Sequence, residues 1–136
     1  MDIAQAQQFL RENECAVLAT TRRNGQVQMS PVTVGVDAEG RAIISSRETA
    51  FKVRNLRRDP QASLCVFVDE FTGPWIQVNG KADVLSLPEA MEPLVDYYRQ
   101  VAGEHPDWDD YRRAMQRDQR VLVRITIESA GPDRKG

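Results

Sequence analysis

The chain has 136 residues, of which 41% are hydrophobic and 28% charged, and its formal net charge is −2. This length suits one domain over residues 1–136 and is too short for two. The acidic balance argues against a broad nucleic-acid surface but leaves room for local basic clusters. Apolar runs fall well short of the ~18 residues of a membrane span. The amino terminus lacks a basic segment followed by an apolar one, so no secretory signal is predicted and a cytoplasmic protein is expected.

The cysteines and the histidine offer little chemistry. Cys15 and Cys65 lie in apolar stretches, which favour reduced, buried thiols over a disulfide or a metal site. With His105 as the single histidine and no CxxC motif, no zinc site is predicted. His105 lies in the sequence GEHPDW, where we expect a turn or capping role rather than catalysis. No side chain is predicted to act as a nucleophile.

In chain order, Asp2 is a candidate N-cap for an amphipathic first helix, after which the pattern becomes that of strands. Asn24-Gly25 and Glu39-Gly40 are hairpin signals. Strands rich in β-branched residues are predicted over 15–21, 26–36, 41–46, 62–68, 75–86 and 121–129. Six strands that are mostly neighbours in sequence predict a mainly β fold, a six-stranded antiparallel barrel with flanking helices.

The second predicted strand changes phase. Val27 and Met29 fall on one face, whereas the valines after Pro31 continue on the other. A β-bulge at Ser30-Pro31 would explain the reversal, since proline is tolerated in strands mainly at edges and bulges. Bulges gather near functional sites but also form plain barrel corners, so the sequence leaves both interpretations open.

The segment SSRETAFKVRNLRRDP, residues 45–60, predicts a strand end followed by a short helix that Pro60 closes. Lys52 and Arg54 lie near the helix start, expected at Ser46 or Thr49, although this end of a helix favours acids. By contrast, a helix predicted from about 106 to 117 has acids first and arginines last. Hydroxyls, free amides and the Lys52 ammonium would together bind a phosphate. A solvated basic face is the alternative, and we expect it for Arg57 and Arg58.

The chain resembles the pyridoxamine 5′-phosphate oxidase-like split β-barrel family of flavin and deazaflavin proteins. Five segments carry the resemblance in order: ATTRRNGQVQMSPV, ISSRETAFKVRNLRRDPQASL, GPWIQVNGKADV, AGEHPDWDDYRRAM and VLVRITIE. The resemblance is greatest to an actinobacterial branch of F420-dependent enzymes. It implies a homodimer with the cofactor in a groove between subunits. It also implies an oxidoreductase that passes a hydride from reduced coenzyme F420 to a conjugated small organic acceptor.

The resemblance also implies roles for particular residues. Lys52 matches the phosphate-binding lysine of the family, and Trp75 and Gln77 match positions that the partner subunit presents to the cofactor. Trp75 also suits a core or interface aromatic without ligand contact. The backbone at Ser30 to Val32 is expected to run along the cofactor ring. The expected cofactor-binding set is Ser30, Pro31, Val32, Ser45, Ser46, Thr49, Ala50, Lys52, Asn55, Trp75 and Gln77.

One departure bears on the cofactor. Ala50 occupies the position, two residues before the lysine, at which many relatives carry an arginine. Without that guanidinium, we expect weaker binding of the phosphate. Arg47 and Arg54 are candidate replacements. FMN in place of F420, and a carrier that binds either cofactor without turnover, remain alternatives. A barrel for single-stranded nucleic acid ranks last, because only 7% of the residues are aromatic and the chain is acidic.

Overall fold

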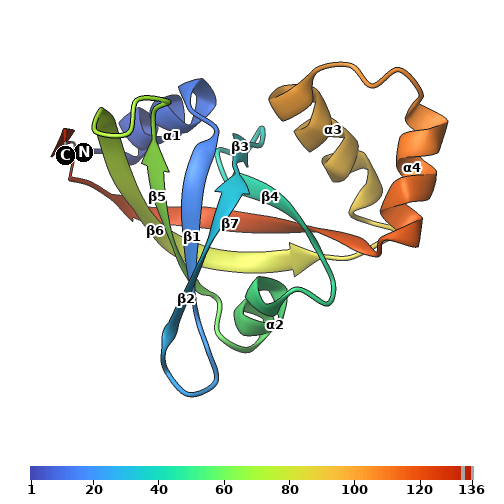
Figure 1. Cartoon of the computed structure of the whole chain (residues 1–136), viewed down its shortest axis with the longest axis horizontal. Helices are drawn as coiled ribbons and strands as arrows, with labels where there is room; N and C mark the ends of the chain where they lie inside the picture. The colour runs from blue at the N-terminus through green and yellow to red at the C-terminus, as the bar shows by residue number, and fades with distance from the viewer. Residues whose placement is uncertain (133, 136) are drawn as a thin grey trace.

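Figure 1 shows the computed structural model of the chain, which describes residues 1–132 and 134–135. The helices are α1 (Ile3–Glu12), α2 (Phe51–Arg58), α3 (Met91–Ala102) and α4 (Trp108–Arg117). The strands are β1 (Cys15–Thr21), β2 (Val27–Thr33), β3 (Gly35–Val36), β4 (Ala42–Arg47), β5 (Gln61–Phe67), β6 (Pro74–Leu85), β7 (Arg120–Ala130) and β8 (Arg134–Lys135). Helices flank a curled sheet, with α2 below it and the α3–α4 pair to one side (Figure 1).

All strand pairs in the described residues are antiparallel, and the order is β2-β1-β5-β6-β7-β4-β3, with β8 beside β6. The mainly β antiparallel fold is therefore confirmed, but the count of six strands is wrong: the main path of the described sheet has seven. The predicted strand 26–36 divides at Val34, whose N–H donates to the Glu14 carbonyl at 2.8 Å. As a result β2 pairs with β1 and β3 with β4.

The predicted bulge at Ser30-Pro31 is also wrong. β2 pairs with β1 without a register shift, Ser30 opposite Leu18 and Pro31 opposite Val17. The phase change arises because Val27 and Met29 point outward, at 59% and 68% exposure, so they do not belong to the core pattern. Pro31 is tolerated because β2 is an edge strand. The irregularity lies instead on β6, between Asn79 and Gly80.

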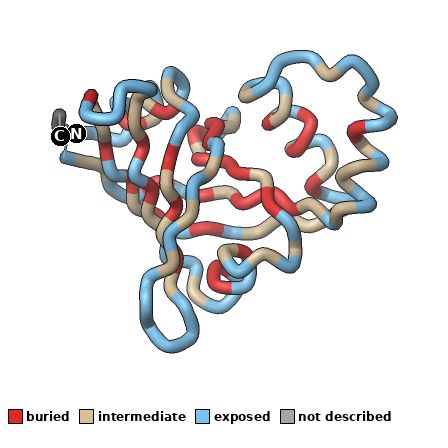
Figure 2. The backbone as a smooth tube through the Cα atoms, viewed as in Figure 1, coloured by how far each residue is buried: buried red, intermediate tan, exposed pale blue. Residues whose placement is uncertain are grey.

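The core lies inside the curled sheet. Aliphatic side chains of every long strand meet there, among them Leu18, Ile44, Leu64 and Ile76. A second, smaller cluster joins α3 to the opposite face of β4 and β7 through Ile43, Leu94, Tyr97 and Leu122. Figure 2 shows this distribution, with buried residues along the strands and the inner sides of α2 and α3.

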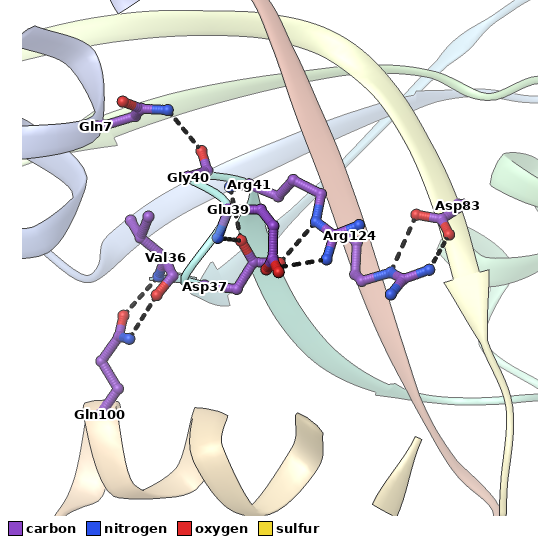
Figure 3. Close-up of polar contacts among 9 residues, drawn as sticks. All are labelled: Gln7, Val36, Asp37, Glu39, Gly40, Arg41, Asp83, Gln100 and Arg124. Carbon is purple, nitrogen blue, oxygen red and sulfur yellow. Dashed lines mark hydrogen bonds and ion pairs between the residues drawn. The ribbon is translucent and has the colours of Figure 1, made fainter. Parts of the chain in front are cut away.

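Polar contacts fix the β3–β4 hairpin to the helices on either side (Figure 3). Gln7 of α1 donates to the Gly40 carbonyl at 3.0 Å. Gln100 of α3 accepts from the Val36 N–H at 2.5 Å and donates to the Val36 carbonyl at 2.6 Å. The hairpin therefore holds β4 in place next to α3, and β4 leads directly into α2.

Among the described residues, none of the helices has the length and apolar character of a membrane span.

Candidate functional site

The site begins where β4 leads into α2. The helix begins at Phe51, not at Ser46 or Thr49, and Thr49 lies exposed in the preceding turn. Ala50 is the N-cap and makes no side-chain cap bond, while the first turn holds no acid. The free backbone N–H groups of this end and its positive dipole are therefore not offset by the helix's own side chains.

Lys52 lies in that first turn and is half-buried. Burial lowers the pKa of its ammonium, and the guanidinium of Arg120 lowers this pKa further. Among the described residues, no carboxylate forms an ion pair with Lys52. Because the positive charge of Arg120 disfavours the charged form of Lys52, an anion bound near both groups would be favourable.

Arg120, the first residue of β7, is the residue that the sequence reasoning missed. It stands opposite Arg47 at the end of the β4–β7 ladder. Its Nε is buried and has no hydrogen-bond partner within the described residues. An arginine at the start of a strand gives no signal in the sequence. Only the long-range pairing of β4 with β7 places Arg120 on the same side of the molecule as Lys52.

The two serines of β4 point in opposite directions, as alternation requires. Ser46 faces the barrel interior at 4% exposure, so its side chain does not reach the Arg120 side of the sheet. Ser45 pairs with Leu122 and shares that side with Arg120. The Tyr97 hydroxyl lies beside the Ser45 backbone and donates to the Thr33 carbonyl at 2.8 Å, while burial raises its pKa.

The expected ring-binding backbone, Ser30, Pro31 and Val32, lies on an open sheet edge. β2 ends the strand order, so its outer edge has no strand partner in the described sheet. β3 pairs with only Ala42 and Ile43, which leaves the rest of β4 open on the same side. β2 and β4 also contact each other, so the split in the barrel lies between two edges with free backbone groups.

Asn55 is buried and holds α2 to the first hairpin. Its Nδ2 donates to Thr20 Oγ1 at 3.1 Å and to Gln28 Oε1 at 3.0 Å. Its Oδ1 accepts from Arg58 at 3.4 Å. The structure therefore gives this side chain a role in attaching the helix, and its polar atoms are already engaged.

The two arginines at the end of α2, Arg57 and Arg58, hydrogen-bond to other parts of the chain and are not only solvated. Arg57 donates to Glu48 and to the Ser86 hydroxyl, at 2.7 and 2.9 Å, and Arg58 donates to the Thr21 carbonyl. Arg54 instead stacks over the Phe51 ring at 5.9 Å. It lines an open groove of about 510 Å³ whose walls are Arg22, Arg23, Gln28, Phe51, Arg54, Asn55 and Arg58.

Trp75 and Gln77 lie on the outer face of the sheet, away from the core. Gln77 is opposite Cys65, and Trp75 is opposite Phe67. Because α2 lies by the other end of β6, where the Ala82 N–H donates to the Pro60 carbonyl at 2.8 Å, one chain does not bring Trp75 to Lys52. His105 has the predicted turn role: its Nδ1 accepts from the Asp107 N–H at 2.9 Å.

The prediction of buried cysteines is wrong. Cys15 and Cys65 are free and exposed on this outer face. Their neighbours in sequence point inward, and strand alternation turns the thiols outward. The outer face is built from three cross-strand rows: Thr33, Cys15, Phe67 and Trp75; Pro31, Val17, Cys65 and Gln77; and Met29, Ala19, Ser63 and Asn79.

The sequence profile of the pyridoxamine 5′-phosphate oxidase family matches residues 3–131. The chain therefore belongs to this family.

Three solved structures have a fold similar to that of this chain. A conserved hypothetical protein from Mycobacterium tuberculosis is 25% identical, with a TM-score of 0.76, and the match covers 96% of this chain and 82% of the other. An F420 reductase is 16% identical, with a TM-score of 0.71 and coverage of 92% and 94%. The heme storage protein HutZ from Vibrio cholerae is 17% identical, with a TM-score of 0.70 and coverage of 100% and 98%.

Proposed function

We propose that the protein is an oxidoreductase that binds coenzyme F420 and passes a hydride from its reduced form to a conjugated small organic acceptor. The observation that carries the proposal is the pair of Lys52, in the first turn of α2, and Arg120, at the start of β7, two partly buried cations that form no ion pair among the described residues. Such a pair suits a phosphate, which this cofactor and FMN both carry. The family and the similarity to an F420 reductase support the choice of a redox cofactor.

The residues at the start of α2 and on β2 and β4 fit a cofactor of this kind. Lys52 would hold the phosphate with the uncapped N–H groups of α2, and Ser45 would add a hydroxyl donor. The open backbone edge at Ser30, Pro31 and Val32 would lie along the ring system. When bound, the deazaflavin supplies the hydride, and the protein orients the ring and excludes water.

The proposal includes a homodimer. The outer face exposes Met29, Pro31 and Cys65, and Trp75 lies among them half-buried. Apolar surface of this kind is suited to an interface. A second copy on this face would let Trp75 and Gln77 of one chain reach the cofactor of the other.

The proposal also includes a cytoplasmic location, because exposed free thiols suit a reducing compartment.

A fluorescence titration of the cofactor-free protein with F420 and, separately, FMN tests the proposal. We expect tighter binding of F420, with loss of at least about tenfold in affinity in Lys52→Ala. Arg113→Ala, which removes one exposed cation from α4, is the matched control and should bind as the unaltered protein does. Failure of both cofactors to bind would overturn the proposal.

Two alternatives share the same site. Preference for FMN in the titration would make the protein an FMN-dependent oxidoreductase, since Lys52 suits either phosphate. A carrier without turnover is the second alternative, and a structurally similar protein is described as a heme storage protein. Consumption of reduced F420 in the presence of a panel of conjugated acceptors separates an enzyme from a carrier.

A further inference from the structure

We infer that Arg120 supplies the guanidinium that Ala50 cannot, so that the cofactor phosphate is held between Arg120 and Lys52. This inference rests on the proposed function and adds a binding residue from a distant part of the chain.

The backbone brings Arg120 to the β4–α2 segment. The Glu48 N–H donates to the Gln119 carbonyl at 3.0 Å, which joins the turn before α2 to the turn before β7. Gln119 itself has φ of 51°, a left-handed conformation that is uncommon for a residue with a side chain. Strained backbone of this kind persists where the surrounding structure requires it, and here it sets the direction of the chain entering β7 at Arg120.

The charges around Arg120 leave it available. Glu48 is a neighbouring carboxylate that lines the same shallow cavity, but both of its oxygens accept from Arg57 at 2.7 Å. The nearby Tyr97 and Tyr111 hydroxyls donate to the carbonyls of Thr33 and Leu94. The Arg120 guanidinium therefore has no ion-pair partner among the described residues, and its buried Nε is a donor that requires an acceptor.

Arg120 fits the missing role better than the two arginines nearest in sequence. Arg47 is exposed on the strand end. Arg54 stacks on the Phe51 ring and lines the groove beside Arg22 and Arg23, on another side of α2. Among these three arginines, only Arg120 acts on the Lys52 ammonium closely enough to lower its pKa.

The test compares ligands that differ only in the phosphate, FMN and riboflavin. If the protein prefers the deazaflavin, the matching pair is the ribityl deazaflavin of F420 with and without a 5′-phosphate, both lacking the tail that follows the phosphate in F420. In Arg120→Gln we expect affinity for the phosphorylated ligand to fall about tenfold and affinity for the other to change less than about twofold. Arg120→Lys should recover part of the loss, and Arg54→Gln is the matched control without effect.

Outcomes that contradict the inference are separate from those that contradict the proposed function. If Lys52→Ala weakens binding of the phosphorylated ligand and Arg120→Gln does not, the proposed phosphate site at Lys52 is supported and Arg120 is not part of it. Equal weakening of both ligands in Arg120→Gln would assign it a purely structural role. A second measurement needs no cofactor. The Arg120→Gln substitution should raise the pKa of the Lys52 ammonium, which an NMR titration measures. An unchanged pKa would show that the two cations lie too far apart to share one phosphate.

Discussion

Lys52 and Asn55 occupy the same short helix and differ in what surrounds them. The Lys52 ammonium has no ion pair in the described part of the chain, whereas the Asn55 amide bonds to Thr20, Gln28 and Arg58. A buried polar group with its bonds complete contributes to stability, and an unpaired cation is available for a ligand. The two residues should therefore respond differently to substitution.

Substitution of Asn55 by alanine should lower the free energy of unfolding by about 1–3 kcal/mol, because the buried Thr20 hydroxyl and the partly buried Gln28 amide lose their partner. Urea unfolding measures this. Gln116→Ala, which removes an exposed amide on α4, is the control and should stay within about 0.5 kcal/mol. A folded Asn55→Ala protein of full stability that loses cofactor affinity would instead make Asn55 a ligand-binding residue.

At the scale of residues, the sequence shows local signals and hides those that depend on long-range pairing. Lys52 stood out because a cation at a helix start contradicts the dipole rule, and the structure shows that helix start without any acid. Arg120 gave no such signal, since its importance depends on the pairing of β4 with β7. Cys15 and Cys65 were misjudged because apolar neighbours say nothing about which face of a strand a side chain takes.

At the scale of elements, the β6–β7 pair depends on a glycine. Gly80 follows the register shift on β6, and a Cβ at this position would lie 2.1 Å from the Thr126 carbonyl oxygen. Backbone cannot move away as a flexible side chain can. Gly80→Ala should therefore lower the free energy of unfolding by about 3 kcal/mol, as severe overpacking does. An unchanged urea midpoint would show that the two strands separate more easily than their pairing suggests.

The helical pair α3–α4 is joined by Tyr111. Its hydroxyl donates to the Leu94 carbonyl at 2.8 Å, and its ring packs against Tyr98 and Trp108 at centroid distances of 5.0 and 5.5 Å. Burial raises the pKa of Tyr111 to about 12. The neutral form is thus favoured in the folded protein, so its contribution to stability is complete below pH 10 and is lost as the pH rises toward 12.

Tyr111→Phe should lower stability by about 1 kcal/mol at neutral pH, because one buried hydrogen bond is lost. The gap in unfolding free energy between the two proteins should narrow from about pH 10 upward, because only the unaltered protein carries the ionisable hydroxyl at this position. Chemical unfolding at pH 8 and pH 11 measures the gap. A gap that stays constant or widens would contradict the raised pKa.

Prediction of elements was reliable for long periodic segments and poor at their junctions. Each of the six predicted strands overlaps an observed strand, because alternation persists over several residues, although the strand predicted over 26–36 corresponds to two, β2 and β3. The break at Val34 and the start of α2 at Phe51 were missed. Both depend on distant partners: the Glu14 carbonyl binds the Val34 N–H, and the turn before α2 is bonded to Gln119.

At the scale of the whole molecule, the outer face of the sheet should mediate dimer formation. Met29, 68% exposed, lies in the row with Ala19 and Ser63. Met29→Asp would place a carboxylate against the partner's apolar surface, so we expect a shift from dimer to monomer in sedimentation analysis. Arg113→Asp, on the exposed side of α4, is the control and should leave the dimer intact. A monomeric unaltered protein would contradict the interface.

The fold of the whole molecule was accessible from sequence because its strands are mostly consecutive neighbours, which leaves few topologies to choose from. The proposed site was only partly accessible, since it joins β2, β4, α2 and β7, and in the proposed dimer a second chain completes it. Trp75 and Gln77 lie on the outer face of the sheet, which the proposal places against the cofactor of the other chain.

The most direct test of the account is a crystal structure of the protein with its bound cofactor, in which the distance from Lys52 Nζ to the nearest phosphate oxygen is measured. We predict a direct contact of about 2.8 Å, the length of a charge-assisted hydrogen bond. The Arg120 guanidinium should lie on the same phosphate. A phosphate bound elsewhere, with Lys52 and Arg120 left in solvent, would contradict the account.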